Sequence, residues 1–183
     1  MINQTDTLRE RFSKIYTSKD EERKKYTLLV SGAAWELIGK FSYSLFADFI
    51  EENKIDLDKY PKRSFELLEH IYYWCFVGGY FAWIAEAELS GKELTIPSVN
   101  SETLFNDWKK YGIDEYAETY NSLSVEFKDI VDSFSEKRIK QFLDNKEIII
   151  DLSVELIDKL KLSFGHSVIH GYILGLSESK QRK

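Results

Sequence analysis

Residues 71–85 read IYYWCFVGGYFAWIA, carry no formal charge, and include seven aromatic side chains among fifteen. A helix that is apolar on every side must be buried. At about 1.5 Å per residue the stretch spans roughly 22 Å, which is shorter than the bilayer hydrocarbon core of about 30 Å. We therefore predict that an apolar helix over about residues 71–89 forms the centre of a water-soluble, all-α bundle.

The size and composition of the chain favour one helical domain. The 183 residues include 43% hydrophobic side chains, which is enough for a sizeable core, and only 9 Gly and 2 Pro. Few glycines and prolines favour long helices over many short strands. We predict a single domain over residues 1–183, compact and made of several helices, with a frayed tail at 177–183 (SESKQRK).

Apolar spacing and capping signals place the other helices. Ser18 to Glu21 has the spacing of a capping box and should begin a helix that continues to about Asn53. The segments at 92–97 (KELTIP) and 147–150 (EIII) leave room for one short strand pair. The remaining helices are expected at Leu8–Tyr16, Pro61–Ser90, Ser101–Tyr111, Asp114–Asn121, Phe127–Phe142 and Ser153–Leu176.

Several functional classes are disfavoured by charge and motif content. The net charge of −6 does not suit a phosphate backbone, so no direct nucleic-acid partner is expected. The single Cys75 cannot form a disulfide within the chain and reads as a small buried hydrophobe. The N-terminal residues MINQTDTLRERF lack the apolar segment of a signal peptide, which predicts a cytoplasmic location and no membrane partner. No phosphate loop, nucleophile elbow or Cys-x-x-Cys is present, so we predict neither a catalytic residue nor a cofactor.

Small residues recur every fourth position on the last predicted helix, at Ser163, Ser167, Gly171 and Gly175. Such a face allows another helix backbone to approach closely. Two partners fit this pattern. One is the glycine-bearing helix of the same chain, and the other is the same helix of a second subunit in a homodimer.

The three histidines offer two enzymatic alternatives. His166 and His170 lie one helical turn apart, a spacing that can bind a metal if His70 supplies a third ligand and Glu36 joins them, although packed, hydrogen-bonded histidines explain the pattern more simply. No metal ligand is therefore assigned. Arg63 and His70 lie two turns apart, and this pair, with AAWELIGK at 33–40, resembles helical RNases of the HEPN type.

Acidic side chains gather in two places that could bind a partner protein. Tyrosine accompanies the second group, and tyrosine is favoured at interfaces because it combines apolar area with a polar group. The first group is Asp48, Glu51, Glu52, Asp56 and Asp58, and the second is Tyr111, Asp114, Glu115, Tyr116, Glu118 and Tyr120.

The overall length and two N-terminal segments, LRERFSKIYTSKDEERKKY at 8–26 and WELIGKFSYSLFADFIEENK at 35–54, carry a resemblance. Taken whole, the chain resembles streptococcal phage anti-CRISPR proteins that act on type II-A Cas9. The resemblance implies a non-enzymatic inhibitor that binds the Cas9 ribonucleoprotein in the cytoplasm of an infected bacterial host, hinders its DNA binding and forms a homodimer. The mixed surface charge points to docking on a basic protein surface and not to mimicry of a DNA duplex. A toxin immunity protein and a HEPN-like RNase are the alternative functions.

Overall fold

A computed structural model describes residues 6–95, 98–110, 120–145 and 152–181. The ordered elements within these ranges are helical, and no strand occurs among them. Residues 92–95 are therefore not part of a strand, while 96–97, 147–150 and most of the predicted helix at 114–121 lie outside the described residues. The elements are α1 (Leu8–Thr17), α2 (Asp20–Leu28), α3 (Gly32–Glu52), the 3₁₀ helix η1 (Leu57–Lys59), α4 (Lys62–Leu89), α5 (Ser101–Lys109), α7 (Val125–Leu143) and α8 (Val154–Ser179).

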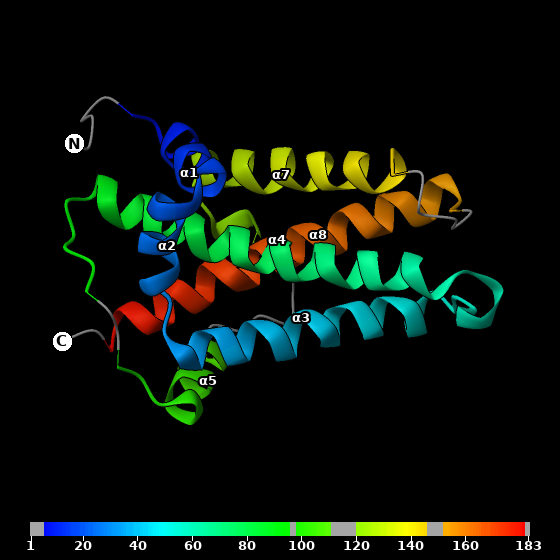
Figure 1. Ribbon diagram of the computed structural model, residues 1–183, viewed down its shortest axis with the longest axis horizontal. Coiled ribbons are helices and arrows are strands. Elements are labelled where there is room, and N and C mark those ends of the chain that lie inside the picture. Colours follow the sequence, from blue (N-terminus) through cyan, green and yellow to red (C-terminus); the bar gives the residue numbers. More distant parts are fainter. Residues whose placement is uncertain (1–5, 96–97, 111–119, 146–151, 182–183) are drawn as a thin grey trace.

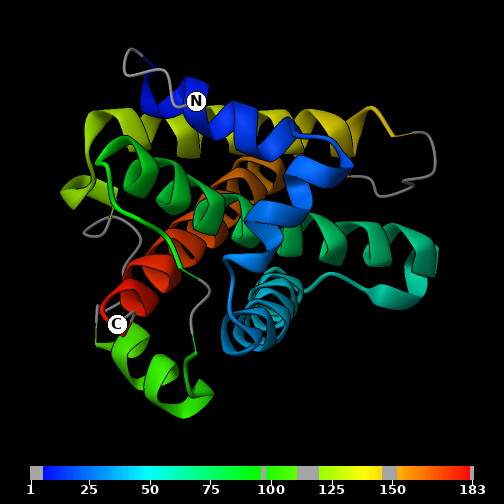
Figure 2. The same ribbon diagram turned by 60° about the vertical axis from the view of Figure 1, so that its left-hand side comes forward.

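Helix α4 contains the uncharged stretch and packs against α1, α3, α7 and α8. In Figure 1 α7 runs along one edge of the bundle and α3 along the other, with α4 and α8 between them. The turned view in Figure 2 shows α8 crossing α4 obliquely. Every residue from Cys75 to Ala85 is buried, and burial raises the pKa of the Cys75 thiol well above its ordinary value. None of the described helices combines the length and apolarity needed to cross a membrane.

The backbones of α4 and α8 touch where they cross, because each helix carries a glycine there. A Cβ atom on Gly79 would lie 1.7 Å from the carbonyl oxygen of Val168, and one on Gly171 would lie 1.8 Å from that of Phe76. One turn further along α8, Gly175 accommodates the ring of Trp83, which a Cβ would approach to 2.8 Å. At Gly171 and Gly175 the small-residue face is thus covered by α4 of the same chain, and these two positions are not open to a second copy.

The prediction of one long helix that begins at Ser18 and continues to about Asn53 is wrong in two respects. The segment is divided into α2 and α3, which are separated by Leu29 to Ser31. The Ser31 side chain accepts a hydrogen bond from the Ala34 N–H at 2.9 Å and begins α3 as its N-cap. The capping box at Ser18–Glu21 does not form, because the Ser18 hydroxyl donates to the Ile15 carbonyl at 2.7 Å. The same spacing at Thr7 and Glu10 forms a capping box at the start of α1.

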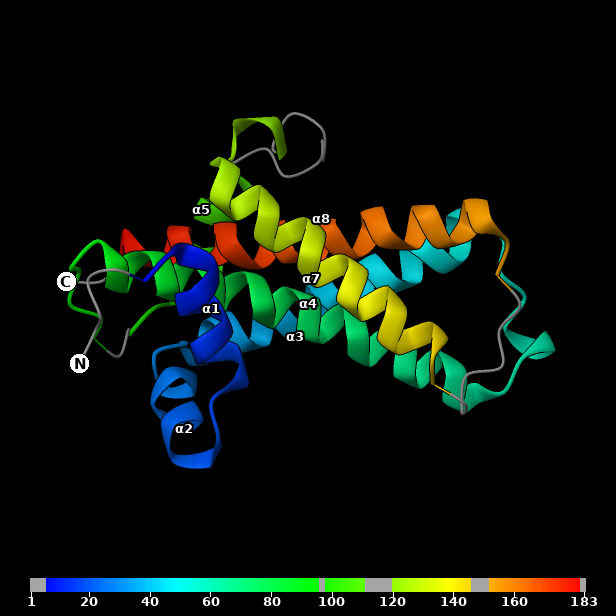
Figure 3. The same ribbon diagram turned by 90° about the horizontal axis from the view of Figure 1, so that it is seen from above.

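The predicted frayed tail is also wrong for the part of it that the structure describes. Helix α8 continues to Ser179, and both Ser177 and Glu178 are fully buried. The Tyr80 hydroxyl donates a hydrogen bond to the Glu178 carboxylate. The Gln181 amide donates to Asp107 of α5 at 2.7 Å, so the end of the chain is tied to a second helix. Seen from above in Figure 3, α7 crosses over α4 and α8 while α2 projects to one side.

Candidate functional site

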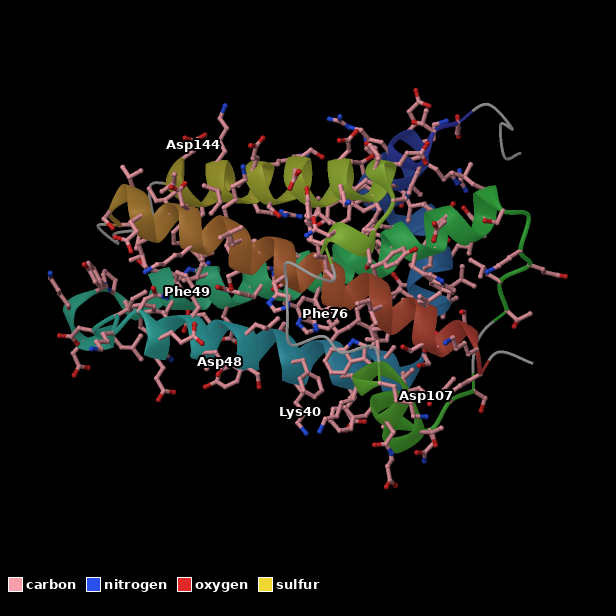
Figure 4. The ribbon with its side chains drawn as sticks, turned by 180° about the vertical axis from the view of Figure 1, so that it is seen from behind. Lys40, Asp48, Phe49, Phe76, Asp107 and Asp144 are labelled. Carbon is pink, nitrogen blue, oxygen red and sulfur yellow. The ribbon has the colours of Figure 1, made fainter. Side chains whose placement is uncertain are left out.

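A groove of about 1080 Å³ lies between α3, α5 and α8. Figure 4 views this side of the molecule, with α3 and α8 running across it and α5 at one end. Asp48 and Phe49 are labelled there on α3, and Asp107 on α5. Since three helices that are distant in sequence form its walls, the groove is a product of tertiary packing. Its walls are formed by Phe41, Ser44, Leu45, Asp48, Phe49, Glu52, Asn53, Phe105, Trp108, Lys109, Lys159, Leu162, Ser163, His166 and His170.

The interior of the groove is aromatic and aliphatic. Phe41 packs between α3 and α5, with its ring 4.5 Å from the centre of Trp108 and 5.5 Å from that of Phe105. The Trp108 indole N–H donates to the backbone carbonyl of His170 at 3.2 Å, which fixes α5 on α8. Leu162 of α8 remains 55% exposed within this wall. An exposed apolar side chain inside a concave, aromatic surface is typical of a binding site.

Charge is distributed unevenly over the two sides of the groove. Asp48 and Glu52 are one turn apart on α3, and both are exposed. On α8 the Lys159 ammonium is already paired with the Glu155 carboxylate at 2.8 Å. Lys109 is the remaining cation among the described lining residues. The α3 side of the groove is therefore acidic and faces solvent.

His166 and His170 form a contacting pair in the α8 wall, with ring centres 4.4 Å apart. His170 is buried, and its ring lies against Phe76 of α4 and Trp108 of α5. Its Nδ1 atom has no hydrogen-bond partner among the described residues. Burial, with a smaller contribution from His166, lowers the pKa of His170 well below its ordinary 6.5. His170 is therefore a neutral imidazole near pH 7.

This neutral imidazole makes stability depend on pH. Below pH about 6.5 the unfolded chain gains a proton at His170 that the folded chain does not accept, so stability present above that pH is lost on acidification. The limiting slope is about 1.4 kcal/mol per pH unit. When the pH falls from about 7 to about 5.5, we expect the free energy of unfolding of His170→Phe to decrease by about 1 kcal/mol less than that of the parent protein. Urea denaturation at the two pH values measures this difference. Equal losses in the two proteins would contradict this assignment.

The structure separates the histidines that sequence spacing had grouped as a metal site. His70 is exposed on α4, does not line the groove, and accepts a hydrogen bond from the Trp74 indole N–H at 2.6 Å. Glu36 accepts from the Ser101 hydroxyl at 2.8 Å. Within the described ranges, no three His, Cys, Asp or Glu side chains are placed to hold a metal ion. The grouping of His70 with His166 and His170 is therefore wrong.

Arg63 and His70, the pair that resembles HEPN-type RNases, lie on the exposed surface of α4. Arg63 is within 3.6 Å of the Glu66 carboxylate, and both side chains face solvent. The hydrogen-bond partner of His70 is Trp74, and the imidazole ring of His70 is stacked near the ring of Tyr73. Neither residue lines the groove between α3, α5 and α8.

The acidic residues predicted to bind a partner do not all lie in the groove. Asp48 and Glu52 line the groove, whereas Glu51, Asp56 and Asp58 are exposed nearby but outside it. Asp56 caps η1 through the Asp58 N–H. The Tyr120 hydroxyl donates to Asp132 of α7 at 2.7 Å. Tyr111, Asp114, Glu115, Tyr116 and Glu118 lie outside the described residues.

Sequence reasoning missed the aromatic interior of the groove. Phe41, Phe105 and Trp108 follow helical spacing, which indicates burial but does not distinguish a closed core from an open groove. No protein-family model, curated protein or solved structure matches this chain.

Proposed function

We propose that this protein is a non-enzymatic binder that receives an amphipathic, basic helical segment of a partner protein in the groove between α3, α5 and α8. The partner that the sequence resemblance names is the Cas9 ribonucleoprotein, whose DNA binding would be hindered. The observation that supports the binding mode is the combination of an aromatic interior with the acidic pair Asp48 and Glu52 on one side.

The shape of the site supports a helix as the occupant. Two long helices flanking an apolar groove form the surface on which an amphipathic helix places its apolar side chains. The partly exposed Phe41 and Phe105 and the exposed Leu162 would contact these apolar side chains. Aromatic side chains in concave surfaces commonly supply most of the binding free energy.

The charge on α3 supports a basic occupant. Asp48 and Glu52 form no ion pair within the part of the chain that the structure describes, in contrast to Lys159 on the opposite side, which is paired with Glu155. Lysine or arginine residues of a docked helix would pair with these two carboxylates at the exposed edge of the interface. Such pairs raise the association rate and select the partner. The same edge would repel a DNA phosphate backbone, which favours indirect inhibition over contact with DNA.

A homodimer, which the resemblance also implies, would need a surface other than Ser163, Ser167, Gly171 and Gly175. At least the last two are in contact with α4 of their own chain. Light scattering on the purified chain measures the oligomeric state directly.

Charge reversal on α3 tests the groove. We expect Asp48→Lys together with Glu52→Lys to weaken binding of a reconstituted streptococcal Cas9–guide RNA complex about tenfold or more, because two attractive contacts become repulsive. Affinity is measured by biolayer interferometry. The matched control reverses two exposed carboxylates on α7, Glu126→Lys with Asp129→Lys, and should change affinity less than twofold.

The two parts of the proposal fail separately. If the unmodified protein does not bind the Cas9 complex, the identity of the partner is wrong. If it binds and both double variants bind equally well, the partner docks elsewhere and the groove is not the site.

A further inference from the structure

A second cavity, of about 410 Å³, lies on the other side of the molecule and is lined by cations. It is formed by the end of α1, by α2, by α4 and by α7, and it shares no residue with the groove between α3, α5 and α8. The residues around it are Tyr16, Thr17, Ser18, Arg23, Trp74, Lys137, Arg138 and Gln141. Of these described residues three are cationic and none is acidic, although the whole chain has a net charge of −6.

Arg138 is the central cation of this cavity. Its guanidinium lies 4.8 Å from the centre of the Phe134 ring and 5.2 Å from that of Tyr16. It donates to the Tyr16 hydroxyl and, at 2.7 Å, to the Gln141 amide oxygen, and neither acceptor carries a charge. Partial burial lowers the pKa of Arg138. A guanidinium has five N–H donors, so donors remain available here.

A second partly buried arginine, Arg11, shows what Arg138 lacks. Arg11 contacts the Glu88 carboxylate through two nitrogen atoms, at 2.5 and 2.7 Å. Because removal of a cation from water is costly without a counter-charge, a carboxylate partner is the expected arrangement. Among the residues whose side chains the structure describes, none that lines the cavity around Arg138 is acidic. An anion from outside the chain would complete this site.

The other cations and Trp74 define what that anion is. Arg23 of α2 lies over the Trp74 ring at 5.0 Å, and Lys137 is exposed on α7. Three cations suit a doubly charged phosphate better than a single carboxylate, because guanidinium groups bind phosphate oxygens through paired donors. The Trp74 indole adds an aromatic wall for a planar ring. The volume falls within the range of small-molecule sites.

We infer that the cavity between α1, α2, α4 and α7 binds the phosphate group of a small phosphorylated ligand, with Arg23, Lys137 and Arg138 as its ligands to phosphate. An aromatic base attached to that phosphate would lie against Trp74. The site is independent of the groove, so its occupancy does not require the partner protein.

The test is isothermal titration calorimetry of the whole chain with inorganic phosphate and with AMP, at constant ionic strength set by NaCl. We expect both probes to bind at micromolar to millimolar concentrations. Arg23→Gln with Lys137→Gln should weaken both about tenfold or more. Lys140→Gln, an exposed cation on the same helix outside the cavity, is the control and should change affinity less than twofold.

Two more variants separate the contributions of the site. Arg138→Gln should abolish measurable binding, and circular dichroism checks that it remains folded. Trp74→Leu should reduce AMP binding to the level of inorganic phosphate. If neither probe binds the folded parent, or if Lys140→Gln weakens binding as much as the cavity variants do, the inference is wrong.

Discussion

Gly171→Ala is expected to lower the free energy of unfolding by about 4 kcal/mol or more, which is a large fraction of the roughly 5–15 kcal/mol of a typical domain. The new methyl carbon would lie 1.8 Å from the Phe76 carbonyl oxygen, an atom of the α4 backbone that no side-chain rotation can move. The two helices would have to separate at their crossing, and the packed side chains around it would lose contact. Urea denaturation followed by tryptophan fluorescence measures the change.

Two other glycines provide a graded control. At Gly175 the added carbon would meet the Trp83 ring at 2.8 Å, and a ring can shift, so Gly175→Ala should cost about 1–3 kcal/mol. At Gly39 on α3 the carbon would meet nothing within 4 Å, and Gly39→Ala should raise stability by about 0.5–1 kcal/mol. A Gly171→Ala protein as stable as the Gly39→Ala protein would show that α4 and α8 are not in direct backbone contact.

Local patterns predicted the helical class and much of the element order, because apolar spacing and caps are properties of neighbouring residues. The division of the predicted second helix into α2 and α3 was missed because apolar residues continue through Leu29 and Val30. Composition alone does not identify Ser31 as an N-cap. The Ser18 and Thr7 capping signals have the same spacing, and only packing decides which one forms. Likewise, the SESK sequence looks like a solvated tail, but Tyr80, 98 residues away, covers Glu178.

The candidate site was only partly predictable for the same reason. The acidic residues Asp48 and Glu52 could be selected from sequence because charge density is local. Their position opposite His166 depends on how α3 and α8 pack, which no short pattern encodes. The spacing of His166 and His170 correctly placed both on one face of a helix, but the addition of His70 required a tertiary contact that does not exist.

Glu88→Ala is expected to destabilise the fold by about 3–5 kcal/mol, the second large effect. The Glu88 carboxylate pairs with Arg11, and the two side chains are only 9% and 12% exposed. Arg11 also donates to the Tyr26 hydroxyl at 2.8 Å, so the pair connects α1, α2 and α4. Removal of the carboxylate leaves a buried guanidinium without its counter-charge. The surface pair Lys24–Glu21 is the control, and Glu21→Ala should cost less than about 0.5 kcal/mol.

Replacement of both partners separates the cost of an orphaned charge from the value of the pair itself. In the double variant Arg11→Met with Glu88→Leu no charge remains to be solvated, and apolar side chains of similar size can fill the space between α1 and α4. We expect this protein to recover at least half of the stability that Glu88→Ala loses. A double-mutant cycle measured by urea denaturation gives the coupling between the two residues. If the double variant is less stable than Glu88→Ala, the ion pair is itself a net source of stability, and the desolvation argument fails for this site.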